Sequence, residues 1–186
     1  ICYSEDGGLT WTFLASSSSI FSGVSHVLYN GVDRWLACGN GSNSLAYSPD
    51  GKTWTGLGYS SATSFNRLAY GNNRWFGAGG QSTANTLSYS TNNGVSWTGL
   101  GMVFDTYGNN LVFNGTNRWV AVGYSETSDA VMYSSDANGT SWTSAGTTLF
   151  TKEALSVAYG GGRWVACGKG NKLAYSDNGS QWTIPT

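Results

Sequence analysis

Side chains that can do chemistry are few in this chain of 186 residues, of which 10% are charged. The only histidine and three other polar residues each stand three residues before an aromatic residue: His26, Arg67, Asn110 and Ser156 precede Tyr29, Tyr70, Phe113 and Tyr159. An imidazole, a guanidinium, an amide and a hydroxyl held close together can bind a sugar or an acidic group. We therefore predict a ligand-binding ring at these four positions. The alternative is that they line a solvated channel without a ligand.

Catalytic carboxylates are sparse by comparison. Generic glycoside hydrolysis needs two carboxyl groups that converge to within ~5–9.5 Å, and the acids Asp105, Glu126, Asp129 and Glu153 are spread over several loops. No His/Cys spacing suits a metal, and no nucleophile elbow or phosphate loop is present in the sequence. The three cysteines occupy positions that hold small residues in other copies of a repeat described below, so we expect them to be buried. The sequence therefore predicts no enzyme, no metal and no cofactor.

The elements that position these residues are indicated by a short box that occurs five times. Each copy begins with Tyr-Ser, passes through a turn rich in Asp, Asn and Gly, and ends at Trp11, Trp54, Trp97, Trp142 or Trp182. These tryptophans are 43, 43, 45 and 40 residues apart, a spacing that is typical of repeat architectures. A second motif between the boxes begins with Arg-Trp at residues 34, 74, 118 and 163. Residues that recur in every copy are expected to serve the scaffold.

Each period divides into four short apolar runs, rich in β-branched and aromatic residues, that predict antiparallel strands. In the last copy they cover residues 155–159, 163–168, 172–176 and 181–184. A four-stranded meander of ~40–45 residues matches a β-propeller blade, and a solenoid of hairpins is the alternative. We predict an all-β propeller of about five four-stranded antiparallel blades. It forms a single domain over residues 1–186, with a half blade at 1–22 and complete blades at about 23–60, 61–104, 105–150 and 151–186.

The box resembles the Asp-box, or BNR, repeat of sialidase-type β-propellers, whose pattern is Ser-x-Asp-x-Gly-x-x-Trp. Residues Ser4 to Trp11 match this pattern fully, and the other copies depart from it by a residue in length or by Asn92 in place of Asp. The resemblance implies that the box forms the turn between the third and fourth strands, with its Asp capping the turn and its Trp between blades. It assigns this structural role to Asp6, Trp11, Asp50, Trp54, Asn92, Trp97, Asp136, Trp142 and Trp182. Such boxes serve enzymes and non-enzymes alike.

A meander also fixes which loops share an end of the propeller. The turns between first and second strands and the boxes lie at one end, here called the box end, and all other loops lie at the variable end. We expect His26, Arg67, Asn110 and Ser156 at the start of the first strands, beside the central channel at the variable end. A ligand is expected there, because loops on a rigid scaffold usually carry recognition.

These features favour a non-catalytic binding or structural module that recognises a glycan or a protein. The chain resembles repetitive, charge-poor proteins of surface, viral and phage assemblies, which favours an extracellular, surface or virion-associated location. A net charge of −1 gives no footprint for nucleic acid, and no apolar run reaches the ~18 residues of a membrane span. An upstream segment or a neighbouring subunit is expected to complete the half blade, because it leaves a strand edge unpaired. The alternative function is a sialidase-like glycoside hydrolase.

Overall fold

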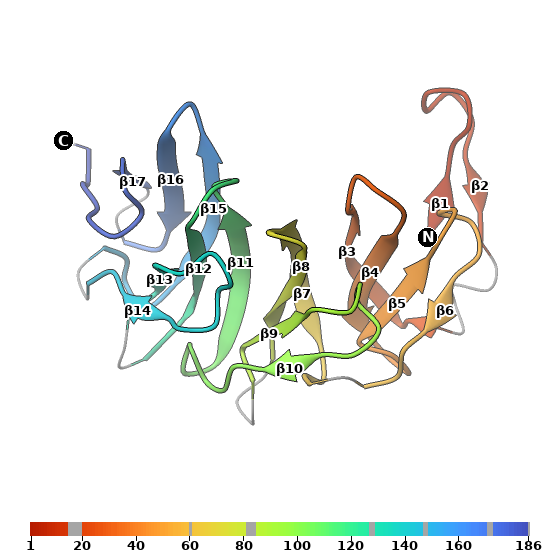
Figure 1. Ribbon diagram of the computed structural model, residues 1–186, viewed down its shortest axis with the longest axis horizontal. Coiled ribbons are helices and arrows are strands. Elements are labelled where there is room, and N and C mark those ends of the chain that lie inside the picture. The colour runs from red at the N-terminus through yellow and green to blue at the C-terminus, as the bar shows by residue number, and fades with distance from the viewer. Residues whose placement is uncertain are drawn as a thin grey trace.

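The protein has a β-propeller fold built from antiparallel sheets that follow one another in chain order (Figure 1). The computed structural model describes residues 1–14, 20–59, 61–80, 85–126, 129–146, 149–170 and 173–185. Within these residues the chain forms one sheet of two strands, three sheets of four strands and one sheet of three strands. The predicted all-β fold of about five four-stranded blades is thereby confirmed.

We number the sheets I to V along the chain. Sheet I holds β1 (Cys2–Tyr3) and β2 (Thr12–Phe13). Sheet II holds β3 (Gly23–Tyr29), β4 (Trp35–Asn40), β5 (Leu45–Ser48) and β6 (Thr55–Gly56). Sheet III holds β7 (Phe65–Gly71), β8 (Arg74–Gly79), β9 (Leu87–Ser90) and β10 (Thr98–Gly99). Sheet IV holds β11 (Tyr107–Phe113), β12 (Trp119–Tyr124), β13 (Val131–Ser134) and β14 (Thr143–Ser144). Sheet V holds β15 (Ala154–Gly160), β16 (Arg163–Gly168) and β17 (Leu173–Ser176), and a single bridge from Tyr175 to Thr183 stands where the fourth strand is expected.

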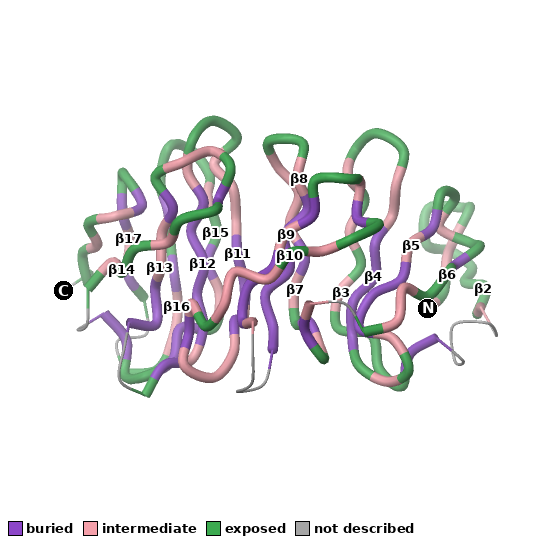
Figure 2. Tube along the Cα trace, turned by 60° about the horizontal axis from the view of Figure 1, so that its bottom comes forward, coloured by how far each residue is buried: buried purple, intermediate pink, exposed green. Residues whose placement is uncertain are grey.

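The core lies between successive sheets, and the repeat motifs fill it. Leu36 and Cys38 of β4 pack against Leu68 and Trp75 of sheet III in one buried cluster. Equivalent clusters join sheet III to sheet IV and sheet IV to sheet V. The motif tryptophans at these three junctions, Trp75, Trp119 and Trp164, are at most 1% exposed. In Figure 2 the second and third strands of sheets II to IV are largely buried, while many of the turns at both ends are exposed. Each sheet is therefore held mainly by its neighbours, as in other repeat proteins.

The box glycines show why the turns need their sequence. Gly94 has a φ of +82°, a conformation that favours glycine. A Cβ at this position would also lie 2.7 Å from Cδ1 of Leu36 in sheet II. The glycine therefore serves both the turn and the packing of two sheets.

The first strands of sheets II to V lie side by side and form one inner surface. Strand β3 contacts β7, β7 contacts β11, and β11 contacts β15. The two ends of the chain lie at opposite ends of the row of sheets (Figure 1). Side chains on the first strands of four sheets can therefore meet on this inner surface.

Candidate functional site

Each first strand of sheets II to V contains a β-bulge directly before a predicted ligand residue. The register with the second strand shifts between Val24 and His26, and at the equivalent places before Arg67, Asn110 and Ser156. Bulges redirect the side chains beside them. The four residues stand third or fourth in strands of seven. They therefore lie in the middle of the strands and not at the start, because each strand continues past the bulge toward the variable end.

Polar side chains beside the bulges link neighbouring first strands. The Leu68 amide donates to Nδ1 of His26 at 3.3 Å, and the bulged residues Asn66 and Asn109 donate to the carbonyls of Gly108 and Ala154 at 2.9 and 3.0 Å. A first strand is the edge of its sheet, so one row of its backbone groups lies outside the ladder. These side chains satisfy part of that edge and tie the sheets together.

Asn110 and Ser156 belong to the same set of links. Nδ2 of Asn110 donates to Oγ of Ser156 and to the Val157 carbonyl, both at 3.1 Å. Its Oδ1 accepts from the Leu111 amide at 2.8 Å, and the residue is 6% exposed. Both amide hydrogens of Asn110 are used, so this side chain has little left to offer a ligand.

Arg67 and His26 retain hydrogen-bond donors. Burial, helped by the positive charge of Arg67, lowers the pKa of His26 to about 4. The imidazole is therefore neutral near pH 7, and since Nδ1 accepts from Leu68, its proton lies on Nε2. Among the described residues, none accepts a hydrogen bond or ion pair from the Arg67 guanidinium. A guanidinium and an imidazole N–H thus stand close together, a pairing that suits a carboxylate.

His26, Arg67, Asn110 and Ser156 all line one cavity of about 650 Å³ along the first strands, which we call the inner cavity. Toward the box end it is lined by four aromatic side chains, which we call together the aromatic ring: Tyr29, Tyr70, Phe113 and Tyr159. Each of these rings packs on the motif tryptophan of its own sheet, with centroids 4.6 to 5.0 Å apart. No aspartate or glutamate occurs among the described lining residues. The cavity therefore combines a cation with four supported aromatic faces.

The aromatic ring was not predicted from the sequence, which placed a ligand at the variable end only. The signal was present, because an aromatic residue follows three positions after each predicted ligand residue. Because this aromatic residue recurs in every copy, it was assigned to the scaffold and not to a binding site. Packing on the motif tryptophan and lining a cavity are compatible, because a ring has two faces.

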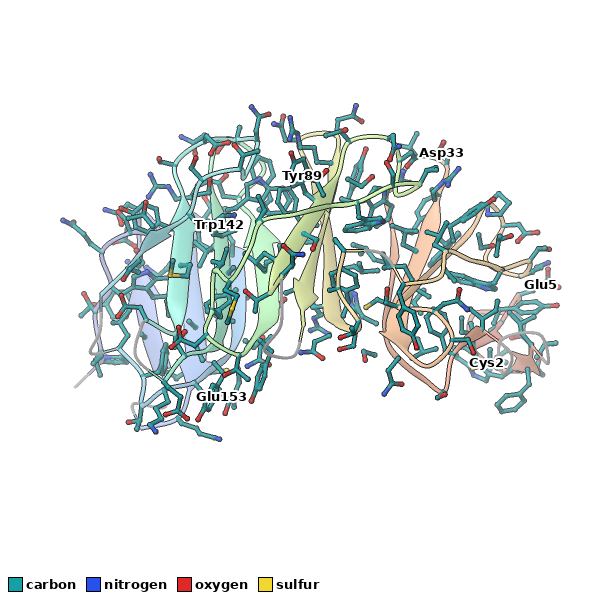
Figure 3. All side chains as sticks on the ribbon, turned by 90° about the horizontal axis from the view of Figure 1, so that it is seen from below. Cys2, Glu5, Asp33, Tyr89, Trp142 and Glu153 are labelled. Atoms are coloured by element: carbon teal, nitrogen blue, oxygen red, sulfur yellow. The ribbon has the colours of Figure 1, made fainter. Side chains whose placement is uncertain are left out.

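Two carboxylates of the variable end, Glu126 and Glu153, are ionised and paired with lysines. Figure 3 labels Glu153 at one edge of the molecule and Asp33 at the opposite edge. Glu153 is buried, pairs with Lys169 at 2.6 Å and accepts from Tyr107 at 3.1 Å, and its pKa is lowered by these and other hydrogen bonds despite its burial. Glu126 pairs with Lys152 and accepts from Tyr124, which lowers its pKa as well. Carboxylates held ionised in this way are poor general acids.

Asp129 differs from these acids. It is 6% exposed, burial raises its pKa, and its Oδ1 has no hydrogen-bond partner among the described residues. A raised pKa is what a general acid needs, but glycoside hydrolysis needs a second carboxylate at a suitable distance. Neither Asp129 nor any other acid lines the described part of the inner cavity.

The boxes are turns closed by their own side chains. In the second box, Oδ1 of Asp50 accepts from the amides of Lys52 and Thr53 at 2.8 and 2.7 Å, and Oγ of Ser48 donates to it at 2.9 Å. In the first box, hydrogen bonds from the Thr10 hydroxyl and amide and from the Ser4 hydroxyl lower the pKa of Asp6 to about 2. Capping acceptors at equivalent places are Asp6, Asn92, Asp136 and Asn178.

In the fifth box the cap is Asn178, which was not among the box residues predicted from the sequence. Its Oδ1 accepts from the amides of Ser180 and Gln181, both at 2.9 Å, while Asp177 pairs with Arg163 at 2.7 Å. The available signal was the spacing Ser-x-Asp/Asn, since Asn178 follows Ser176 as Asp50 follows Ser48.

The box tryptophans each donate Nε1 to the carbonyl of a box glycine, at 2.9 to 3.1 Å. Four of the five, Trp54, Trp97, Trp142 and Trp182, are buried or half-buried, whereas Trp11 of sheet I is exposed. The four motif arginines are scaffold too. Arg34, Arg74, Arg118 and Arg163 lie over the ring of the box tyrosine in their own sheet, at 4.5 to 5.5 Å. Arg67 is thus the one arginine outside the repeated motifs.

The expectation that all three cysteines are buried is wrong for two of them. Cys38 is buried, but Cys167 is half-buried and Cys2 is exposed. Both lie in the outermost sheets, V and I, which lack a neighbour on one side in the described chain. The described residues contain no group of three or more His, Cys, Asp and Glu side chains that suits a metal, and no helix long and apolar enough to cross a membrane.

Comparison with known proteins gives structural likeness only. No protein-family model matches the chain, and no curated protein matches it in sequence. Among solved structures it is similar to the GH74 enzyme of Niastella koreensis, with a TM-score of 0.63 and 25% identity. The match covers 100% of this chain and 28% of that enzyme.

A second likeness is to YCF48 bound to D1 peptide, with a TM-score of 0.68 and 17% identity over 98% of this chain and 60% of the other. A third is to the extracellular domain of the putative hybrid two-component system BT3049 of B. thetaiotaomicron, with a TM-score of 0.63, 12% identity, and coverage of 89% and 25%. The chain therefore spans less than two thirds of each of these proteins. The likeness supports a β-propeller fold, which such different proteins share.

Proposed function

We propose that the chain is a non-catalytic propeller module that binds a carboxylate-bearing peptide in the inner cavity. It acts as one domain over residues 1–186, with the half blade and four blades in the ranges given above. The observation that carries the proposal is the Arg67 guanidinium, which has no partner among the described residues and lines a cavity whose described residues include no acid. A half-buried cation without a counter-charge is costly, and a bound carboxylate removes that cost.

The remaining lining supports a peptide. Arg67 holds the carboxylate through two parallel N–H···O bonds, and the neutral His26 donates a third from Nε2. The aromatic ring of Tyr29, Tyr70, Phe113 and Tyr159 supplies apolar faces for a side chain farther along the peptide. The likeness to YCF48, which was solved with a D1 peptide, is consistent with this class of ligand.

The test is a binding screen with paired peptides that differ only in a C-terminal carboxylate or carboxamide, and in Glu or Gln side chains. We expect carboxylate peptides to bind, and Arg67→Ala to weaken them about 10- to 100-fold, as for the loss of a charged hydrogen bond of about 1.5–3 kcal/mol. Arg67→Lys should fall between the two, because it keeps the charge and loses the paired geometry. Arg163→Ala is the matched control, since it removes the same charge from an exposed ion pair in sheet V. Equal binding of acid and amide peptides would refute the proposal.

A glycan is the second candidate, favoured by the likeness to the GH74 enzyme and by the aromatic ring. An array that includes acidic sugars decides between the two ligands. Hydrolysis by the chain belongs to the same alternative and should then depend on Asp129, whose pKa is raised by burial. Turnover of fluorogenic glycosides that is abolished by Asp129→Asn would replace the peptide-binding proposal with a sialidase-like or other glycoside hydrolase.

A further inference from the structure

One position of the repeat holds an asparagine in three sheets and an aspartate in one. It lies two residues before the third strand, in the loop at the variable end, and sheets II to V fill it with Asn43, Asn85, Asp129 and Asn171. Asn171 lies outside the described residues, so the comparison rests on the other three. An amide and a carboxylate have the same shape, but only the amide has hydrogens to donate. The exchange therefore changes the hydrogen bonding at this position and not the space that the side chain fills.

The asparagine ties together two segments that flank its sheet. We call the segment between the last strand of one sheet and the first strand of the next a crossover. In sheet III, Oδ1 of Asn85 accepts from the Gly101 amide and Nδ2 donates to the Ser61 carbonyl, both at 2.8 Å. Asn43 makes the same two bonds in sheet II, at 2.6 and 2.8 Å. In both sheets the side chain therefore joins the crossover that enters the sheet to the crossover that leaves it.

Asp129 completes only half of this link in sheet IV. Its carboxylate accepts from the amide of Gly146, which follows the fourth strand as in the other sheets. Oδ1 of Asp129 has no hydrogen-bond partner among the described residues, although the residue is 6% exposed. The carbonyl that the repeat sets opposite this oxygen is that of Phe104, which stands four residues before the bulged pairing of its first strand, as Ser61 does in sheet III. By the repeat, two acceptors thus meet where the other sheets place a donor and an acceptor.

We propose that Asp129 is a proton-operated latch at the variable end of sheet IV. With a proton on Oδ1, the carboxyl group donates to the Phe104 carbonyl and joins the two crossovers, as Asn43 and Asn85 do in their sheets. Loss of this proton removes the donor and leaves two buried acceptors facing each other, which is costly. The latch is therefore closed by acid and opened at neutral pH, and it controls how firmly the loops of this end are held.

No positive charge acts on Asp129 among the described residues. Burial raises its pKa, and the hydrogen bond from the Gly146 amide is the one contact that opposes this effect. The charged groups of the surrounding loops are engaged with one another: Lys152 with Glu126, Lys169 with Glu153, and Asp105 with Glu126 by repulsion. Within the described surroundings, a proton is therefore the compensating charge that is left for this carboxyl group.

The first test is Asp129→Asn, which restores the donor at every pH. At pH 7 this variant should have a Tm at least about 2 °C above that of the wild type, because a buried acceptor without a partner is removed. The folded pKa of Asp129 lies above the ordinary 3.8, so between these values the folded wild type binds more protons than the unfolded chain. The free energy of unfolding of the wild type, relative to the variant, should therefore rise as the pH falls through this interval. The advantage of the variant should shrink by more than half at pH 4, and measuring both proteins at each pH cancels the titration of His26 and of the other carboxylates.

The second test moves the latch to sheet III. Asn85→Asp places a carboxylate opposite the Ser61 carbonyl, and it should lower Tm more at pH 7 than at pH 4. This variant is the matched control, because it makes at the same repeat position the exchange that Asp129→Asn reverses. In the wild type, the carboxyl carbon of Asp129 should titrate above 3.8 when it is followed by NMR with isotope-labelled aspartate.

The outcomes separate the latch from other roles of Asp129. A gain in Tm for Asp129→Asn that is equal at pH 7 and pH 4 would overturn the proposal, and so would a carboxyl carbon that titrates at or below 3.8. A Tm of Asp129→Asn below that of the wild type at pH 7 would overturn it as well. Stabilisation of the wild type by calcium chloride would then show that a metal ion, and not a proton, holds the carboxylate.

Discussion

Replacing Leu87 by alanine should destabilise the protein far more than the same change at Leu173. Both leucines begin the third strand of their sheets, as Leu45 does in sheet II. Leu87 is 0% exposed, in a cluster with Phe76, Leu111 and Trp119, whereas Leu173 is 49% exposed. The pair therefore compares one substitution at one repeat position with and without a following sheet.

The magnitudes follow from burial. A fully buried leucine that is cut to alanine leaves a cavity and costs about 2–5 kcal/mol. At Leu173 about half of the side chain already meets water, so the loss is about 1 kcal/mol or less. For a chain of this length each kcal/mol lowers Tm by about 2–4 °C. We expect a fall of about 4–20 °C for Leu87→Ala and of under about 4 °C for Leu173→Ala.

Thermal and urea denaturation followed by tryptophan fluorescence provide the measurement, with Leu45→Ala as a second interior control. The reasoning is refuted if Leu173→Ala and Leu87→Ala lower the free energy of unfolding equally. Leu173 would then be covered in solution by something that sheet V does not meet within the described chain.

Two further predictions concern titration and the turns. His26 is the only histidine, so its imidazole C–H resonances can be followed by NMR, and they should titrate near pH 4. Because the pKa of His26 in the folded protein lies below the ordinary 6.5, the unfolded chain binds one more proton between pH 4 and 6.5. The free energy of unfolding should therefore fall as the pH drops from about 6.5 to about 4. A measured pKa of 6 or above would contradict the burial of the imidazole. In the boxes, Asp50→Asn should leave Tm nearly unchanged, because Asn178 accepts from the two equivalent amides, those of Ser180 and Gln181, in the fifth box. Asp50→Ala should lower Tm through loss of the acceptor for the Lys52 and Thr53 amides. Equal Tm values for the two Asp50 variants would contradict a capping role.

The fold could be predicted because the repeat reports on it five times. Strand β16 covers residues 163–168 as expected, since Arg-Trp begins the run and Gly168 ends it. The bulges could not be predicted, because no one residue type marks them: the bulged residues are Ser25, Asn66, Asn109 and Leu155. A bulge is set by how one strand edge meets the next sheet, and a single sequence does not record that contact.

The sequence singled out four of the residues that line the candidate site, but neither their place in the strands nor the aromatic residues beside them. Aligning the repeats singled out His26, Arg67, Asn110 and Ser156, which line one cavity. Only the hydrogen bonds show that these residues have different roles. Asn110 of sheet IV bonds Ser156 of sheet V, whereas the Arg67 guanidinium bonds none of the described residues. The aromatic residues of the cavity were not predicted, because a residue that recurs in every repeat was assumed to have a structural role only.

Arg67 is the position at which the needs of the scaffold and those of a site separate. A first strand must satisfy its own exposed edge, and His26, Asn66 and Asn109 do so by bonding the backbone of the next strand. Asn66 already makes this link for β7, so the link between β7 and β11 does not require a hydrogen bond from Arg67. A guanidinium at that place is costly to desolvate, and it also depresses the pKa of the neighbouring His26. A residue that breaks a local rule without a structural gain is where function is expected, and an acidic ligand in the inner cavity is the partner that would offset its cost.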